Sequence, residues 1–280
     1  MTQPEKRSLL CPNCRKLISR DEPHCPHCGI SKPGSWWKNN MLMKGFKSPD
    51  AVIRTLIGAN VGLYILSLFL YPIRLNFANP LMALSPSNNS LFLLGATGTI
   101  PMDQYHHWWS LLSANYLHGS LLHIIFNMLA LRQLAPLVAQ TFGPYRMITI
   151  YTVTGILGFG VSYAAGVDFT IGASAAICGL IGSALYYGKS RGGTYGEAIF
   201  KHVSGWLIGL FFIGLMPGIN NWGHGGGIMA GILFGFLLGY QEKKPEGLLD
   251  KSLAAICILA TGIVLAWSIL YALLYRFFGV

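Results

Sequence analysis

The chain has 280 residues, of which 52% are hydrophobic and 11% are charged, and its formal net charge is +10. A soluble domain carries about 25% charged residues, so this composition excludes an ordinary water-soluble enzyme and predicts a protein embedded mostly in lipid. Almost all Lys and Arg residues precede residue 55 or lie in short connections between apolar runs. This distribution is typical of membrane topology and argues against a nucleic-acid partner, which would need a clustered basic face.

The N-terminal region carries two CxxC pairs, ten residues apart: Cys11, Cys14, Cys25 and Cys28. Four thiolates at this spacing can surround one Zn²⁺ tetrahedrally. The alternatives are disulfides or unused thiols, but a disulfide across two residues is strained, and so short a segment buries little core without a metal. We therefore expect residues 1–32 to form a zinc-ribbon-like domain with structural zinc in the reducing cytosol, followed by a linker over residues 33–50.

Seven apolar runs follow, each close to the length of about 20 residues that crosses a bilayer. They cover residues 51–73, 116–138, 145–166, 171–188, 203–217, 222–241 and 253–275. Seven buried helices of a soluble protein are the alternative, but connections this short would leave too little polar surface. The sequence therefore predicts an all-α polytopic membrane protein.

Basic connections alternate with connections that contain almost no Lys or Arg, and the basic ones include those near Arg146, Lys189 and Lys243. The positive-inside rule places these connections and the N-terminus in the cytosol, and the C-terminus outside. The short loops and the cytosolic zinc domain fit a bacterial cytoplasmic membrane best. The long outer connection over residues 74–115 is rich in aromatic residues, so we expect a structured loop in the outer membrane interface.

Polar side chains within apolar runs are costly, so each one is a functional candidate. The second run carries two histidines and, four residues after the second of them, an asparagine on the same helix face. The fourth run begins with a serine in its first turn, and the sixth holds a histidine beside a glycine repeat that allows close helix packing. Because these three runs all pass from outside to inside, the candidates share one depth below the outer surface: His118, His123, Asn127, Ser174 and His224.

A serine in a membrane helix usually bonds back to its own backbone, which is the alternative to a catalytic role for Ser174. Its place in a first helical turn, where N–H groups are unpaired, and the small Gly172 before it favour an approachable nucleophile. His224 can remove the hydroxyl proton, and because these runs contain no Asp or Glu, the pair would be a dyad that needs no cofactor. His123, Asn127 and the serine backbone N–H are candidate donors to an oxyanion.

At these positions the chain resembles the rhomboid family of intramembrane serine proteases, over roughly residues 50–250. Three motifs in order carry the resemblance: HGSLLHIIFNMLAL, GASAAICGL and GHGGGIMAG. The resemblance implies a six-helix core over residues 51–242, with Ser174 as nucleophile and His224 as general base. It also implies transmembrane protein substrates that are cut near the outer bilayer face. The zinc domain and the seventh helix, within residues 243–280, lie outside it.

By the same resemblance, His123 and Asn127 would help to form the oxyanion hole, with His118 and Gly172 supporting the site. The family pattern changes at four positions, which here carry Ser110, Ala139, Ala175 and Cys178. These changes favour a second hypothesis, a catalytically inactive rhomboid-like protein that binds transmembrane helices. The retained nucleophile, base and donors favour an active protease. A transporter or channel is the third hypothesis, which the lack of repeated halves and the off-centre polar cluster oppose.

Overall fold

The structure is a computed structural model that describes residues 8–11, 16–29, 31–34, 49–72 and 84–279. By its internal contacts the chain separates into two compact units, Met1–Val52 and Ile53–Val280. Most of the predicted linker, residues 35–48, lies outside the described residues.

The N-terminal unit contains a small antiparallel hairpin of β1 (Ser8–Leu10) and β2 (Leu17–Ser19). Its buried core consists of Cys11, Ile18 and Cys25. A core of this size supplies little of the free energy that folding requires. Cysteine side chains therefore occupy the centre of this unit, where a larger domain would place aliphatic residues.

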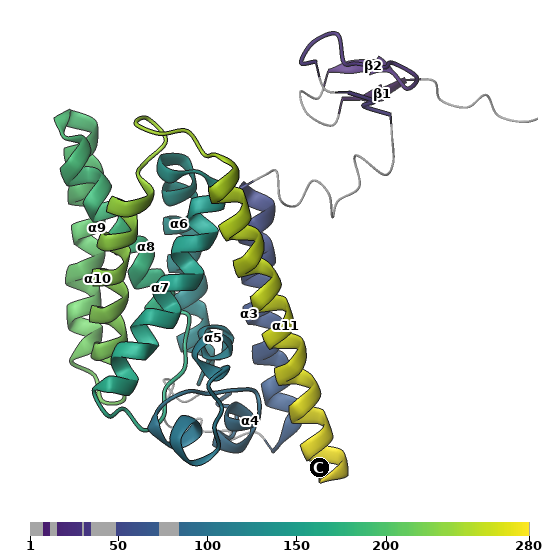
Figure 1. Cartoon of the computed structure of the whole chain (residues 1–280). Coiled ribbons are helices and arrows are strands. Elements are labelled where there is room, and N and C mark those ends of the chain that lie inside the picture. Colours follow the sequence, from purple (N-terminus) through teal and green to yellow (C-terminus); the bar gives the residue numbers. More distant parts are fainter. Residues whose placement is uncertain (1–7, 12–15, 30, 35–48, 73–83, 280) are drawn as a thin grey trace, which may run out of the picture. The chain divides into compact units, whose positions relative to one another are not determined.

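The second unit is helical throughout its described part (Figure 1). Four short elements follow the first long helix: α4 (Asn88–Leu93), the π-helix η2 (Ile100–Gln104), α5 (Ser110–Ser113) and the 3₁₀-helix η3 (Ala114–Tyr116). The long helices are α3 (Pro49–Leu70), α6 (Leu121–Phe142), α7 (Pro144–Ala164), α8 (Ser174–Arg191), α9 (Gly193–Gly214), α10 (Asn221–Leu238) and α11 (Leu248–Phe278). Helix α8 contacts α6, α7, α9 and α10, so it is the central helix of the bundle.

Five helices in the described part are long and apolar enough to cross a membrane: α3, α6, α7, α9 and α11. The protein is therefore a mostly helical membrane protein with several spans. The two remaining predicted runs correspond to α8 and α10, which have 18 residues each. Helix α8 is buried along most of its length and ends in Lys189 and Arg191, so it is less uniformly apolar than helices that face lipid.

The predicted fifth run, residues 203–217, is wrong at both ends, because α9 covers Gly193–Gly214. Its first turns contain Glu197 and Lys201. These charged residues lower the local hydropathy, so the apolar run begins later than the helix does. The helix ends before Pro217, which cannot continue it.

Glycines bring the backbones of α8 and α10 into direct contact. A Cβ added at Gly231 would overlap the carbonyl oxygen of Gly179, and one added at Gly182 would overlap that of Ile228. At Gly227, the overlap would be with the carbonyl oxygen of Ala175. The glycine repeat of the sixth run therefore allows the close packing that the sequence predicts.

The connection over residues 74–115, which is predicted to lie on the outer side, is structured in its described residues, 84–115. It is joined to the connection between α7 and α8 by a two-way backbone pair, in which Thr97 N donates to Thr170 O (3.1 Å) and Thr170 N to Thr97 O (2.7 Å). In the same way, Gly172 N donates to Ala114 O (2.9 Å). This predicted outer loop thus holds the segment that leads into α8.

At the opposite end of the bundle, Arg146 at the start of α7 is completely buried. Its guanidinium donates to both carboxylate oxygens of Asp250, at 2.8 and 3.1 Å. It also donates to the carbonyl oxygens of Gly239, Lys244 and Pro245. One side chain thereby ties α7 to the end of α10, to the connection that follows and to α11.

Candidate active site and metal site

Ser174 is the first residue of α8, and the backbone before it favours glycine. Gly172 has φ +127°, a conformation that side chains with a Cβ rarely adopt. The first helical hydrogen bond is donated by Ile177 to Ala173 O, so the N–H groups of residues 174–176 have no partner within the helix. The serine hydroxyl therefore lies beside unpaired donors at the positive end of a helix.

His224 lies in the first turn of α10 and faces the serine. Its Nε2 is 2.9 Å from Ser174 Oγ, which is hydrogen-bonding distance. Its Nδ1 is buried and has no hydrogen-bond partner among the described residues. Among the described residues no carboxylate is hydrogen-bonded to the imidazole, so the hydroxyl and the imidazole meet without a third, acidic group. No aromatic ring is stacked on His224 among the described residues either.

His123 presents a donor next to this pair. Its Nδ1 accepts a hydrogen bond from Gly119 N (3.3 Å), so in the neutral imidazole the proton is on Nε2. That Nε2 would lie 2.9 Å from a Cβ added at Gly172, and the same Cβ would be 3.5 Å from Ser174 Oγ. A glycine thus keeps open the space between the Ser174 hydroxyl and a ring N–H.

Asn127 and His118 both contact His123. The Asn127 amide donates to the His123 carbonyl oxygen (2.8 Å), one turn away on α6. The His118 ring is fully buried and packs edge-on against the His123 ring, with centroids 5.0 Å apart. Neither His118 ring nitrogen has a partner in standard hydrogen-bond geometry within the described structure. The structure therefore brings all five polar candidates of the sequence to one end of α6, α8 and α10.

Two of the positions at which the family pattern changes lie in the packing between helices. The Ala175 methyl group belongs to a buried cluster with Ala114 and Phe159. Cys178 is buried, and its Cβ would be 3.1 Å from a Cβ added at Gly227 on α10. Both side chains therefore contribute to helix packing next to Ser174 and His224.

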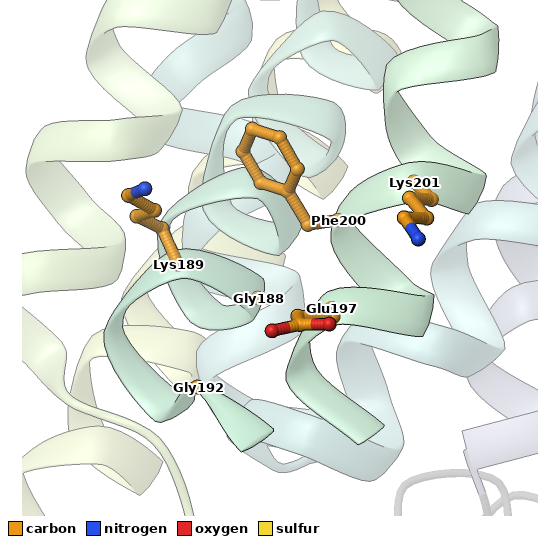
Figure 2. Close-up of a pocket in the computed structure, with 6 residues that line it drawn as sticks. All are labelled: Gly188, Lys189, Gly192, Glu197, Phe200 and Lys201. Atoms are coloured by element: carbon orange, nitrogen blue, oxygen red, sulfur yellow. The ribbon is translucent and has the colours of Figure 1, made fainter. Parts of the chain in front are cut away.

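A pocket between α8 and α9 lies elsewhere (Figure 2). It is lined by Gly188, Lys189, Gly192, Glu197, Phe200 and Lys201. These residues are at the end of α8 that is remote from Ser174, and none of them is a candidate from the sequence. The candidate active site therefore rests on the Ser174 hydroxyl and the His224 imidazole, and not on a cavity.

In the N-terminal unit, the sulfur atoms of Cys11, Cys25 and Cys28 all lie within 4.8 Å of one another. The Sγ atoms of Cys11 and Cys28 are 3.6 Å apart. Tetrahedral zinc with bonds of about 2.3 Å separates its sulfur ligands by about 3.8 Å, so these cysteines could hold a metal ion. The fourth predicted ligand, Cys14, lies outside the described residues.

Comparisons with known proteins show which family this part of the chain resembles. Residues 105–241, which contain all five polar candidates, match the rhomboid domain family. RHOMBOID-like protein 7 of Arabidopsis thaliana is 34% identical over 166 residues, which cover 58% of this chain and 52% of that protein. Rhomboid protease GluP of Bacillus subtilis is 31% identical over 206 residues, 72% of this chain and 38% of that protein.

Inactive RHOMBOID-like protein 8 of Arabidopsis thaliana is also similar, 32% identical over 156 residues that cover 54% of this chain and 44% of that protein. The chain spans about half the length of the curated relatives it matches. The match of residues 105–241, which contain the hydroxyl, the imidazoles and the amide that meet at one end of the bundle, leads to one conclusion: this part of the chain is a domain of the rhomboid family.

Proposed function

We propose that this protein is an intramembrane serine endopeptidase that cuts transmembrane proteins with a Ser174–His224 dyad. The observation that carries the proposal is the distance of 2.9 Å between His224 Nε2 and Ser174 Oγ, at a helix start with unpaired N–H groups. A structural serine would bond to its own helix, as Ser183 does with the carbonyl oxygen of Leu180. The Ser174 hydroxyl instead bonds to a base on another helix.

In the proposed reaction, Ser174 Oγ attacks the scissile carbonyl carbon while His224 Nε2 takes the hydroxyl proton. The oxyanion that forms accepts hydrogen bonds from the Ser174 backbone N–H and from His123 Nε2–H. The carbon–nitrogen bond then breaks, and the imidazolium returns its proton to the leaving amine. A water molecule, activated by the same imidazole, hydrolyses the acyl-enzyme and restores the serine.

In this proposal Asn127 also donates to the oxyanion, because its amide nitrogen carries a second hydrogen besides the one donated to the His123 carbonyl oxygen. His118 acts through His123. Asn127 fixes the helical turn on which His123 stands, and His118 supports its ring. The substrate is a membrane-spanning protein because the site lies among helices that face lipid. Its peptide bond would be cut near the outer bilayer face, where a helix can unwind.

The test is proteolysis in liposomes with a single-span substrate protein, comparing the wild type with Ser174→Ala and His224→Ala. We expect cleavage by the wild type and its loss in both variants. Ser183→Ala is the matched control, since it removes a buried hydroxyl from the same helix, and it should cleave normally. Cleavage that survives Ser174→Ala would disprove the dyad.

The second candidate is an inactive rhomboid-like protein that binds transmembrane helices. The similarity to a relative named as inactive, together with the changes at Ala175 and Cys178, favours it. It predicts that folded wild-type protein cleaves none of several substrates yet co-purifies with them. The same liposome experiment therefore separates the two functions.

The proposed cofactor is a structural zinc ion held by Cys11, Cys14, Cys25 and Cys28, with no part in catalysis. Three of these sulfurs already lie close enough to share one ion. We also propose a cytosolic N-terminus and an external C-terminus in a bacterial cytoplasmic membrane, on the basis of the basic connections. A reporter that is active only outside the cell, fused to the C-terminus, tests this orientation.

A further inference from the structure

The side chain of Asn220 joins three elements that meet at the candidate active site. Its Nδ2 donates to Ser162 Oγ on α7 (2.7 Å) and to Thr170 Oγ1 in the connection before α8 (2.9 Å). Its Oδ1 accepts from Gly223 N at the start of α10 (3.0 Å). Both hydrogens of the amide nitrogen and its oxygen are therefore used, each toward a different segment.

On the α10 side, Asn220 fixes the turn that carries His224. Its side chain caps the helix through Gly223, and its carbonyl oxygen accepts from His224 N (3.2 Å). A Cβ added at Gly223 would lie 3.0 Å from Asn220 Nδ2 and 3.0 Å from Ser162 Oγ. The asparagine thus lies directly against the first turn of α10.

On the α8 side, Thr170, which accepts from Asn220, is held by further hydrogen bonds. Thr170 exchanges two backbone hydrogen bonds with Thr97 of the outer loop and precedes Ser174 by four residues. Ser162 is fully buried and donates its own hydroxyl hydrogen to Gly158 O (3.1 Å). Asn220 therefore links the turn of the base to two anchored points, one of which leads into the nucleophile.

No carboxylate is hydrogen-bonded to the His224 ring among the described residues, so its position depends on the backbone that carries it. We propose that Asn220 is a positioning residue, which holds the first turn of α10, and with it His224, at bonding distance from Ser174. This inference rests on the proposed protease function. It extends that function by assigning to an amide, acting through the backbone, part of the role that an acidic residue plays in a triad.

The experiment measures cleavage of a single-span substrate in liposomes, the rate at which a fluorophosphonate probe labels Ser174, and the thermal unfolding midpoint. A misplacement of 1 Å can cost about 10²-fold, so we expect Asn220→Ala to lower kcat and the labelling rate by roughly 10- to 100-fold, with KM unchanged. Thr170→Val, which keeps the shape but lacks the acceptor, should lower both in the same direction. Thr170→Ser, which keeps the hydroxyl, should have a kcat and a labelling rate close to those of the wild type.

Asn221→Ala is the matched control, because among the described residues the neighbouring amide donates to Gly214 O (2.8 Å) and to no group of α7 or Thr170. It should label and cleave at the wild-type rate. If Asn220→Ala were labelled at the wild-type rate, the positioning role alone would be overturned. The same would follow if the loss of cleavage and labelling in every variant matched its unfolded fraction. A wild type that neither cleaves nor labels would instead overturn the protease and, with it, this inference.

Discussion

Gly172 is constrained for two separate reasons. Its φ of +127° disfavours any residue with a Cβ, and the space that such an atom would fill lies 2.9 Å from His123 Nε2. Gly166, in the same connection, has φ +78° and nothing within 4 Å of an added Cβ. The two glycines therefore share backbone strain but differ in their closeness to the proposed oxyanion donor.

We predict that Gly172→Ala and Gly166→Ala lower the free energy of unfolding by similar amounts, on the order of 1–3 kcal/mol. Only Gly172→Ala should abolish most cleavage, since its methyl group would displace the His123 ring, and the loss of one oxyanion donor costs roughly 10²- to 10³-fold. Substrate cleavage normalised to folded protein checks this difference. Equal losses of activity in the two variants would show that strain, not the ring contact, requires the glycine.

The candidate site residues could be named from the sequence because a hydroxyl, three imidazoles and an amide are conspicuous within apolar runs. Their convergence also follows from the shared direction of three runs. The roles of Asn220 and Thr170 could not be predicted, since their bond joins positions 50 residues apart and no spacing pattern contains it. An asparagine four residues before a histidine indicates, at most, a helix cap.

At the scale of helices, hydropathy predicted the long apolar spans and failed where charge or burial alters the composition. The first turns of α9 carry Glu197 and Lys201, so the helix begins ten residues earlier than its apolar run. Helix α8 is enclosed by four neighbours and needs small residues more than apolar ones. Hydropathy therefore predicts helices that face lipid better than helices that are buried against other helices.

The buried pair of Arg146 and Asp250 attaches α11 to the core, and it allows a prediction at this scale. Asp250→Ala leaves a buried guanidinium without its counter-charge, which should lower the free energy of unfolding by about 3–5 kcal/mol. The exposed pair of Arg191 and Glu242 is the control, and Glu242→Ala should cost less than about 1 kcal/mol. Unfolding in mixed detergent micelles gives both values. Equal costs would mean that the buried pair does not hold α11.

For the whole molecule, the separation into two compact units predicts that metal binding and proteolysis are independent. We expect the full chain to contain zinc, and Cys25→Ser to lose it because one of the clustered thiolates is removed. Elemental analysis of purified protein measures the zinc, and the liposome assay measures cleavage, which should be unchanged. Cleavage that falls together with zinc content would show that the N-terminal unit takes part in the membrane function.

The direct backbone contact between α8 and α10 has a consequence for how the protein meets membranes of different thickness. The proposed nucleophile and base stand on two helices whose backbones meet directly at Gly182, Gly227 and Gly231, so we expect the pair to respond to hydrophobic mismatch by tilting as one block. Bilayer thickness would then change the depth of the dyad while its internal distance stays fixed. Lipids with shorter or longer acyl chains should move the cut along the substrate helix, and cleavage products identified by mass would reveal that displacement.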